Sequence, residues 1–130
     1  MPERVDLLQR KILIVDDQES NVRLLEFALR RGGFTAVSST TDPRTVAAMH
    51  AENRYDLILL DLRMPQMDGF EVLRALRTVE GGKRVPILIL SADPSQMVQA
   101  SDAGATGFLS KPFVLTEVLR CVKGMLESED

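Results

Sequence analysis

The chain has 130 residues and a formal net charge of −3, and 45% of its residues are hydrophobic while 27% are charged. This length suits one domain with a buried core, and the mild acidity excludes a basic surface that would attract nucleic acid or anionic lipid. The single cysteine, Cys121, excludes an internal disulfide, and the single histidine, His50, cannot by itself build a zinc site or a histidine-based triad.

Four short apolar runs rich in Ile, Leu and Val are the strongest candidates for strands. They are continuous rather than alternating, which is typical of strands buried on both faces of a parallel sheet. The runs cover residues 12–15, 57–60, 87–90 and 108–109. A fifth, weaker candidate covers residues 34–39, and its polar content suits a position at the edge of the sheet.

Apolar residues recur at helical intervals between successive strands and after the last one. Asp42-Pro43 and Asp93-Pro94 each combine an N-cap acceptor with proline at the first helical position, which predicts two helix starts. Gly32-Gly33 and Gly81-Gly82 are the predicted ends of two other helices. The last helix carries one apolar face between residues 115 and 126.

This alternation of strand and helix predicts one α/β domain. We expect a single doubly wound, five-stranded parallel sheet flanked by five helices and joined by right-handed crossovers. The domain should span residues 11–126. Residues 1–10 are expected to form an N-terminal tail, and residues 127–130 a C-terminal tail or linker stub.

Polar residues gather where the predicted strands end. Asp16 and Asp17 end the first strand, Asp61 ends the third, Ser91 follows the fourth and Lys111 follows the fifth. In an open α/β sheet, ligands bind at this carboxyl edge, where the strand order reverses. If the first and third strands are neighbours, the three carboxylates converge in one pocket.

The chemistry of this set favours phosphoryl transfer to a carboxylate. Three close carboxylates repel one another unless a hard divalent cation joins them, and Mg²⁺ suits oxygen ligands and a phosphate oxygen, with Mn²⁺ as a substitute. Lys111 offers an ammonium and Ser91 a hydroxyl donor. Each of these residues taken alone is better explained as a cap or a turn former, and their joint occurrence at one edge favours a site.

Four motifs closely resemble those of receiver domains of two-component response regulators. They are ILIVDD at residues 12–17, DLRMPQMDG at 61–69, Ser91-Ala92, and Lys111-Pro112-Phe113. The match runs from about residue 11 to residue 126. The resemblance implies a flavodoxin-like fold with strand order 2-1-3-4-5.

The resemblance also implies the roles of the acidic residues. Asp61 would be the phosphoacceptor, receiving the phosphoryl group from a sensor histidine kinase, a phosphotransfer protein or a small phosphodonor. Asp17, Asp61 and the backbone carbonyl of Arg63 would bind Mg²⁺ directly, and Asp16 would act through a bound water.

The remaining roles concern the phosphoryl group and the response to it. Lys111, across a cis bond to Pro112, and Ser91 would bind the phosphoryl oxygens. Ser91 and Phe108 would then switch the surface formed by the fourth helix, fifth strand and fifth helix. This surface is a candidate site for a second copy of the chain or an effector, whereas Phe108 could equally be a plain core aromatic.

Two departures from the family pattern concern Arg63 and Asp93. Both should overhang the pocket mouth, pair with each other and tune the lifetime of the phosphorylated state. A second apolar stripe on the last helix, formed by Val114, Val118, Cys121 and Met125, is explained by partial burial or by docking of a partner.

Two alternatives remain open beside the phosphoacceptor. A degenerate receiver would act only as a protein-interaction scaffold, and an Asp-nucleophile phosphohydrolase would need a second carboxylate where Arg63 stands. We therefore expect a regulatory domain that catalyses only its own phosphorylation and dephosphorylation. The charged first ten residues and the short apolar runs predict a cytoplasmic protein that contacts neither membrane nor nucleic acid.

Overall fold

The computed structural model describes residues 7–63, 68–79 and 84–128, and all structural statements below concern these residues. The strands are β1 Lys11–Val15, β2 Ala36–Thr40, β3 Leu57–Asp61, β4 Ile87–Ser91 and β5 Gly107–Ser110. The helices are α2 Glu19–Arg31, α3 Val46–Asn53, α4 Gly69–Val79, α5 Met97–Asp102 and α6 Leu115–Ser128. Short 3₁₀ turns, η1 Pro43–Thr45 and η2 Pro94–Gln96, lead into α3 and α5.

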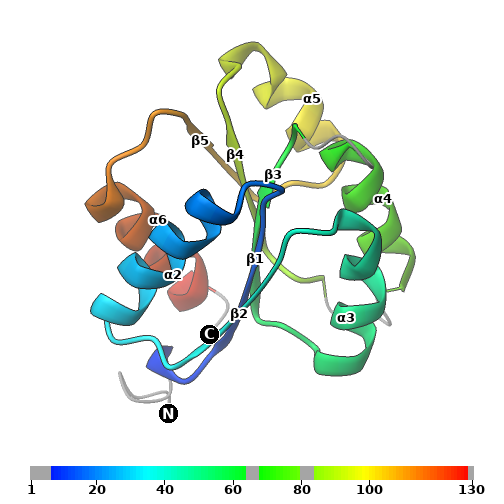
Figure 1. Cartoon of the computed structure of the whole chain (residues 1–130). Coiled ribbons are helices and arrows are strands. Elements are labelled where there is room, and N and C mark those ends of the chain that lie inside the picture. Colours follow the sequence, from blue (N-terminus) through cyan, green and yellow to red (C-terminus); the bar gives the residue numbers. More distant parts are fainter. Residues whose placement is uncertain (1–6, 64–67, 80–83, 129–130) are drawn as a thin grey trace.

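All five strands form one parallel sheet in the order β2-β1-β3-β4-β5, which confirms the predicted topology. The register places Ile12 beside Leu57, and Ile58 beside Ile87. Figure 1 shows α2 and α6 on one side of the sheet and α3 and α4 on the other. The strand order therefore reverses between β1 and β3, the place where the acidic residues were expected.

Two apolar cores hold these layers together, one on each face of the sheet. Successive strand residues face opposite sides, so that Ile12 and Ile14 join the core under α2 and α6, whereas Leu13 and Val15 join the core under α3, α4 and α5. The central strands β3 and β4 are buried along their whole length. This double burial explains why their sequences are continuous apolar runs.

Both ends of the packed domain extend beyond the predicted limits of 11 and 126. Leu7 is buried in the core under α2 and α6, and Leu8 packs against it, although residues 1–10 were expected to be a tail. Helix α6 continues to Ser128. The predicted stop at residues 81–82 lies outside the described residues.

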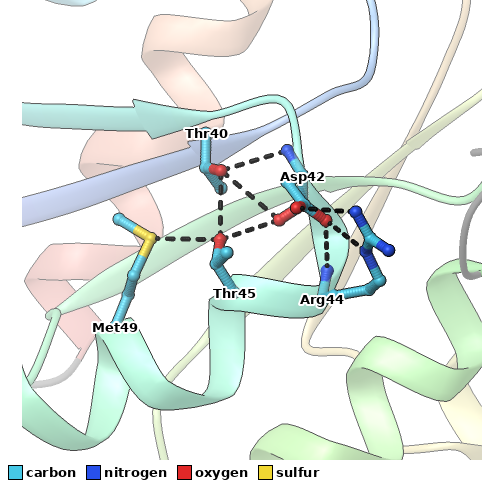
Figure 2. A network of polar contacts seen from close by, with 5 residues as sticks. All are labelled: Thr40, Asp42, Arg44, Thr45 and Met49. Atoms are coloured by element: carbon cyan, nitrogen blue, oxygen red, sulfur yellow. Dashed lines mark hydrogen bonds and ion pairs between the residues drawn. The ribbon is translucent and has the colours of Figure 1, made fainter.

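The turn between β2 and α3 is held by a network of polar contacts (Figure 2). The Asp42 carboxylate accepts a hydrogen bond from the Arg44 backbone N–H at 3.0 Å, which confirms the predicted N-cap. The Asp42 backbone N–H donates to the Thr40 hydroxyl at 3.1 Å, and the Thr45 hydroxyl donates to the Asp42 carbonyl oxygen at 2.8 Å. The Thr40 carbonyl oxygen also accepts from the Asp16 backbone N–H, which ties this turn to the end of β1.

The second apolar stripe of α6 is mostly covered. Val118 is fully buried, and Cys121 and Met125 pack against the core, whereas Val114 is exposed just before the helix begins. Partial burial therefore explains most of the stripe. None of the described helices combines the length and apolar character needed to cross a membrane.

Candidate functional site

Three carboxylates meet at the carboxyl edge of the sheet, as the chain order predicted. Asp16 and Asp17 follow β1, and Asp61 ends the neighbouring strand β3. One carboxylate oxygen from each residue lies within 4.8 Å of the others. Asp16 and Asp61 are buried, with exposed fractions of 1% and 5%, while Asp17 is half-buried. Burial of this kind is unusual for carboxylates and indicates a site rather than a solvated surface.

Few donors within the pocket satisfy these acids. Asp16 Oδ1 accepts from the backbone N–H of Gln18 at 2.9 Å, but its buried Oδ2 accepts no hydrogen bond in the described part of the chain. Asp61 Oδ1 accepts a long bond, 3.3 Å, from the backbone N–H of Arg63. Lys111 Nζ lies 3.4 Å from Asp61 Oδ1 and 3.6 Å from Asp16 Oδ2. One ammonium thus serves two buried carboxylates.

The electrostatics of Asp61 reflect mainly its burial. Burial raises the pKa of the Asp61 carboxyl above its usual value, and the Asp16 charge raises it further. The Lys111 ammonium and the Arg63 amide lower that pKa, but they do not fully compensate. Among the described residues, three carboxylates share one ammonium, so the pocket holds more negative charge than this cation can balance.

The donor set fits a small hard cation. Magnesium prefers carboxylate oxygens and retained waters, and the orphaned Asp16 Oδ2 together with the cluster of three carboxylates supplies such ligands. Arg63 lies at the same edge, two residues after Asp61 in the chain, where its backbone amide already contacts the acid. A divalent ion would remove the charge imbalance that the protein alone leaves.

Ser91 lies at the end of β4, the strand next to Asp61, and is 1% exposed. Its hydroxyl donates to the side-chain Oε1 of Gln96 at 2.8 Å and accepts from the backbone N–H of Asp93 at 3.1 Å. Gln96 was not among the predicted site residues. The available signal was a repeated pattern, since a hydroxyl residue, an Asp-Pro pair and a polar residue five positions on occur at 40–45 and again at 91–96.

Lys111 is joined to this part of the site through its backbone. Its N–H donates to the Ser91 carbonyl oxygen at 2.7 Å, and the peptide bond between Lys111 and Pro112 is cis, as expected. Phe108 on β5 is partly buried against the core under α3, α4 and α5. It also lines a pocket of about 240 Å³ together with Met97 and Ala100 of α5.

The expected ion pair between Arg63 and Asp93 is not formed in the described residues. The Asp93 carboxylate accepts instead from the backbone N–H and the hydroxyl of Ser95, at 3.0 and 2.6 Å. These bonds lower the Asp93 pKa, and the field of Arg63 is the weakest of the causes that do so. The prediction failed because Ser95 lies two residues away and satisfies the carboxylate at little entropic cost.

Comparisons with known proteins agree on one family. The model of the response regulator receiver domain matches residues 12–123. The chain is 40% identical over 118 residues to the transcriptional regulatory protein PrrA of Mycobacterium tuberculosis, covering 89% of this chain and 49% of PrrA. It is 37% identical over 105 residues to the chemotaxis protein CheY of Pseudomonas aeruginosa, covering 79% and 85% of the two chains. The chain thus spans about half the length of PrrA.

Solved structures give the same answer. Chemotaxis protein CheY4 of Vibrio cholerae superposes with a TM-score of 0.83 at 33% identity, covering 90% of this chain and 98% of that chain. The receiver domain of sensor histidine kinase PA1611 from Pseudomonas aeruginosa, which holds a magnesium ion in its active-site cleft, has a TM-score of 0.82 at 32% identity, covering 92% and 98%.

Proposed function

Because the chain belongs to the response regulator receiver domain family, we propose that it accepts a phosphoryl group on Asp61 from a sensor histidine kinase or a phosphotransfer protein. The observation that most supports this is the convergence of three carboxylates within 4.8 Å at the end of β1 and β3, with Lys111 Nζ 3.4 Å from Asp61. The chain is then a regulatory domain whose chemistry is limited to its own phosphorylation and dephosphorylation.

The residues that would hold the metal follow from the same cluster. Asp17, Asp61 and the backbone carbonyl of Arg63 are proposed as direct ligands of Mg²⁺ or Mn²⁺, and Asp16 as a ligand through water. A bound cation would balance the charge of the acids and of the phosphoryl oxygens. Consistent with this, the neighbouring PA1611 receiver is described with magnesium in its cleft.

Transfer requires an oxygen of Asp61 to attack phosphorus. The new bond joins that oxygen to phosphorus, the bond from phosphorus to the donor's imidazole nitrogen breaks, and the imidazole leaves with the electron pair. Before the reaction Lys111 contacts the carboxylates of Asp61 and Asp16; afterwards its ammonium is in reach of a phosphoryl oxygen. Ser91, at the end of the next strand, would donate its hydroxyl proton to another phosphoryl oxygen.

The output is proposed to be a change on the surface formed by α5, β5 and α6. A shift of Ser91 moves the turn that begins α5, and Phe108 borders the pocket between β5 and α5. The changed face would then bind a second copy of the chain or an effector. Arg63 and Asp93 stay proposed as residues that tune the phosphorylated lifetime from the pocket mouth, although they form no direct pair.

The test is incubation of the full chain with acetyl phosphate, with and without Mg²⁺, followed by mass spectrometry of the intact protein. We expect a phosphate-sized mass gain that requires the metal and is lost in Asp61→Asn. Asp102→Asn, an exposed acid on α5, is the matched control and should gain the same mass as wild type. Phosphate on Asp61→Asn, or no gain on wild type with Mg²⁺, would contradict the proposal.

A further inference from the structure

The only proton of the Ser91 hydroxyl is engaged before any phosphoryl group arrives. A serine hydroxyl has one proton, and here it is directed to Gln96 Oε1 at 2.8 Å. One of its lone pairs accepts from the Asp93 backbone N–H at 3.1 Å. With 1% exposure, Ser91 has little access to water that could replace either partner.

Gln96 is placed where a change in Ser91 would reach a helix. It is the last residue of η2 and directly precedes α5, which begins at Met97. Its contact with Ser91 therefore links the end of β4 to the start of α5. Met97 also lines the pocket beside Phe108. Release of this one contact would loosen the junction between the phosphorylation site and the helix proposed to respond to it.

The corresponding position in the turn after β2 shows what a purely structural residue does there. Thr45 lies five residues after Thr40, as Gln96 lies five residues after Ser91. The Thr45 hydroxyl donates to the backbone carbonyl of Asp42 at 2.8 Å and lies 3.1 Å from the Thr40 hydroxyl. The Thr40 hydroxyl, the counterpart of the Ser91 hydroxyl, donates to the same Asp42 carbonyl oxygen at 3.3 Å, so its acceptor belongs to the backbone. Around Ser91, by contrast, the acceptor is the end of a side chain that can withdraw.

We propose that Gln96 is a positioning residue that competes with the phosphoryl group on Asp61 for the single proton of the Ser91 hydroxyl. The proposal rests on the proposed function of Asp61. While Gln96 holds the proton, Ser91 cannot donate to the phosphoryl group. Phosphorylation must displace this hydrogen bond before the β4–α5 turn can rearrange, so Gln96 sets how readily the chain responds.

The test uses Gln96→Met, which keeps the length of the side chain but replaces the amide oxygen with a thioether sulfur, a much weaker acceptor. The probe is beryllofluoride added to Mg²⁺-saturated protein as a phosphoryl mimic, and its dissociation constant is measured from backbone amide shifts. Losing a competing hydrogen bond should tighten binding about fivefold in Gln96→Met. Thr45→Val, the matched control in the other turn, should bind like wild type.

A double-mutant cycle separates competition from a general loosening of the turn. In a Ser91→Ala background the proton at issue is absent, so adding Gln96→Met should leave the dissociation constant unchanged. If Gln96→Met does not fold, Gln96→Ala replaces it, with a thermal melt as the check. An unchanged constant in the single variant, or a tightening that persists without the Ser91 hydroxyl, would overturn the role of Gln96. Failure of wild type to bind beryllofluoride would instead contradict the proposed function itself.

Discussion

The polar turn after β2 and the acidic pocket beside the turn after β4 use the same kinds of residue to different ends. After β2, the Asp42 carboxylate is paired with its own cation, since Arg44 Nε and Nη2 lie 2.9 and 3.1 Å away. In the pocket, Asp16 and Asp61 share the single ammonium of Lys111 at 3.6 and 3.4 Å, and Asp16 Oδ2 accepts no hydrogen bond among the described residues. The hydrogen-bonded groups after β2 hold a turn in place, whereas the carboxylates of the pocket still have oxygens that can bind a ligand.

The hydroxyls of Thr40 and Ser91 differ in the same way. Thr40 lies on the edge strand and is surrounded by groups of its own turn (Figure 2). Ser91 lies on an inner strand next to Asp61, and its donor proton goes to the replaceable side chain of Gln96. The position in the sheet, rather than the local sequence pattern, decides which turn is able to respond.

Replacement of Lys111 should give the largest effect, because it removes the only cation that contacts the pocket acids within the described residues. Lys111→Met should weaken beryllofluoride binding about 10-fold to 100-fold, as expected for a hydrogen bond to a charged group. Titration of Mg²⁺-saturated protein measures this constant. The β2 turn should be unaffected, and binding equal to that of wild type would show that Lys111 does not contact the phosphoryl group.

Removal of one pocket acid should stabilise the metal-free protein, in contrast to removal of an acid that has its own partner. Asp17→Asn relieves repulsion among the three carboxylates, so it should raise the metal-free free energy of unfolding by about 1 kcal/mol. It should also abolish most of the stabilisation that Mg²⁺ gives to wild type. Denaturant unfolding with and without Mg²⁺ measures both. A lower stability without metal would show that the acids are not in conflict.

Features set by the packing of whole strands could be predicted from the sequence, whereas contacts between individual side chains could not. The continuous apolar runs predicted the strands, and the resemblance to receiver domains implied their order. The meeting of Asp16, Asp17 and Asp61 followed from that order and from the rule that parallel strands present their carboxyl ends at one edge. The pattern shared by residues 40–45 and 91–96 draws attention to Gln96, but whether its side chain reaches Ser91 depends on rotamers within the turn. Burial of Leu7 was missed because two adjacent leucines before a strand form no helical or strand-like pattern.

Thr45→Val tests the structural character of the β2 turn. It removes the donor to the Asp42 carbonyl oxygen while keeping the shape of the side chain, so the free energy of unfolding should fall by about 1 kcal/mol. Thermal or denaturant unfolding measures this loss. Unchanged stability together with altered beryllofluoride binding would contradict the purely structural role of the β2 turn.

The smallest expected effect is a pH dependence that the two turns share. Hydrogen bonds from Arg44 hold the Asp42 pKa below its usual value of 3.8, and hydrogen bonds from Ser95 do the same for Asp93. Each charged form therefore adds stability that is present above pH 3.8 and is lost as the pH falls through the lower folded pKa. Asp42→Asn and Asp93→Asn keep a capping oxygen but should each slightly reduce the loss of stability at acid pH. The free energy of unfolding is measured between pH 2 and 5, a window set around the value of 3.8. If it falls with decreasing pH as steeply in the variants as in wild type, the charges of these caps do not contribute.

Backbone amide shifts of the Mg²⁺-saturated chain, recorded before and after beryllofluoride, test the contrast between the two turns most directly. We predict large shifts in residues 91–97 and at Phe108, and small shifts in residues 42–46. Shifts of equal size in both turns, or none after Ser91, would contradict the view that the acidic pocket and the Ser91 hydroxyl form the part of the molecule that responds to a phosphoryl group.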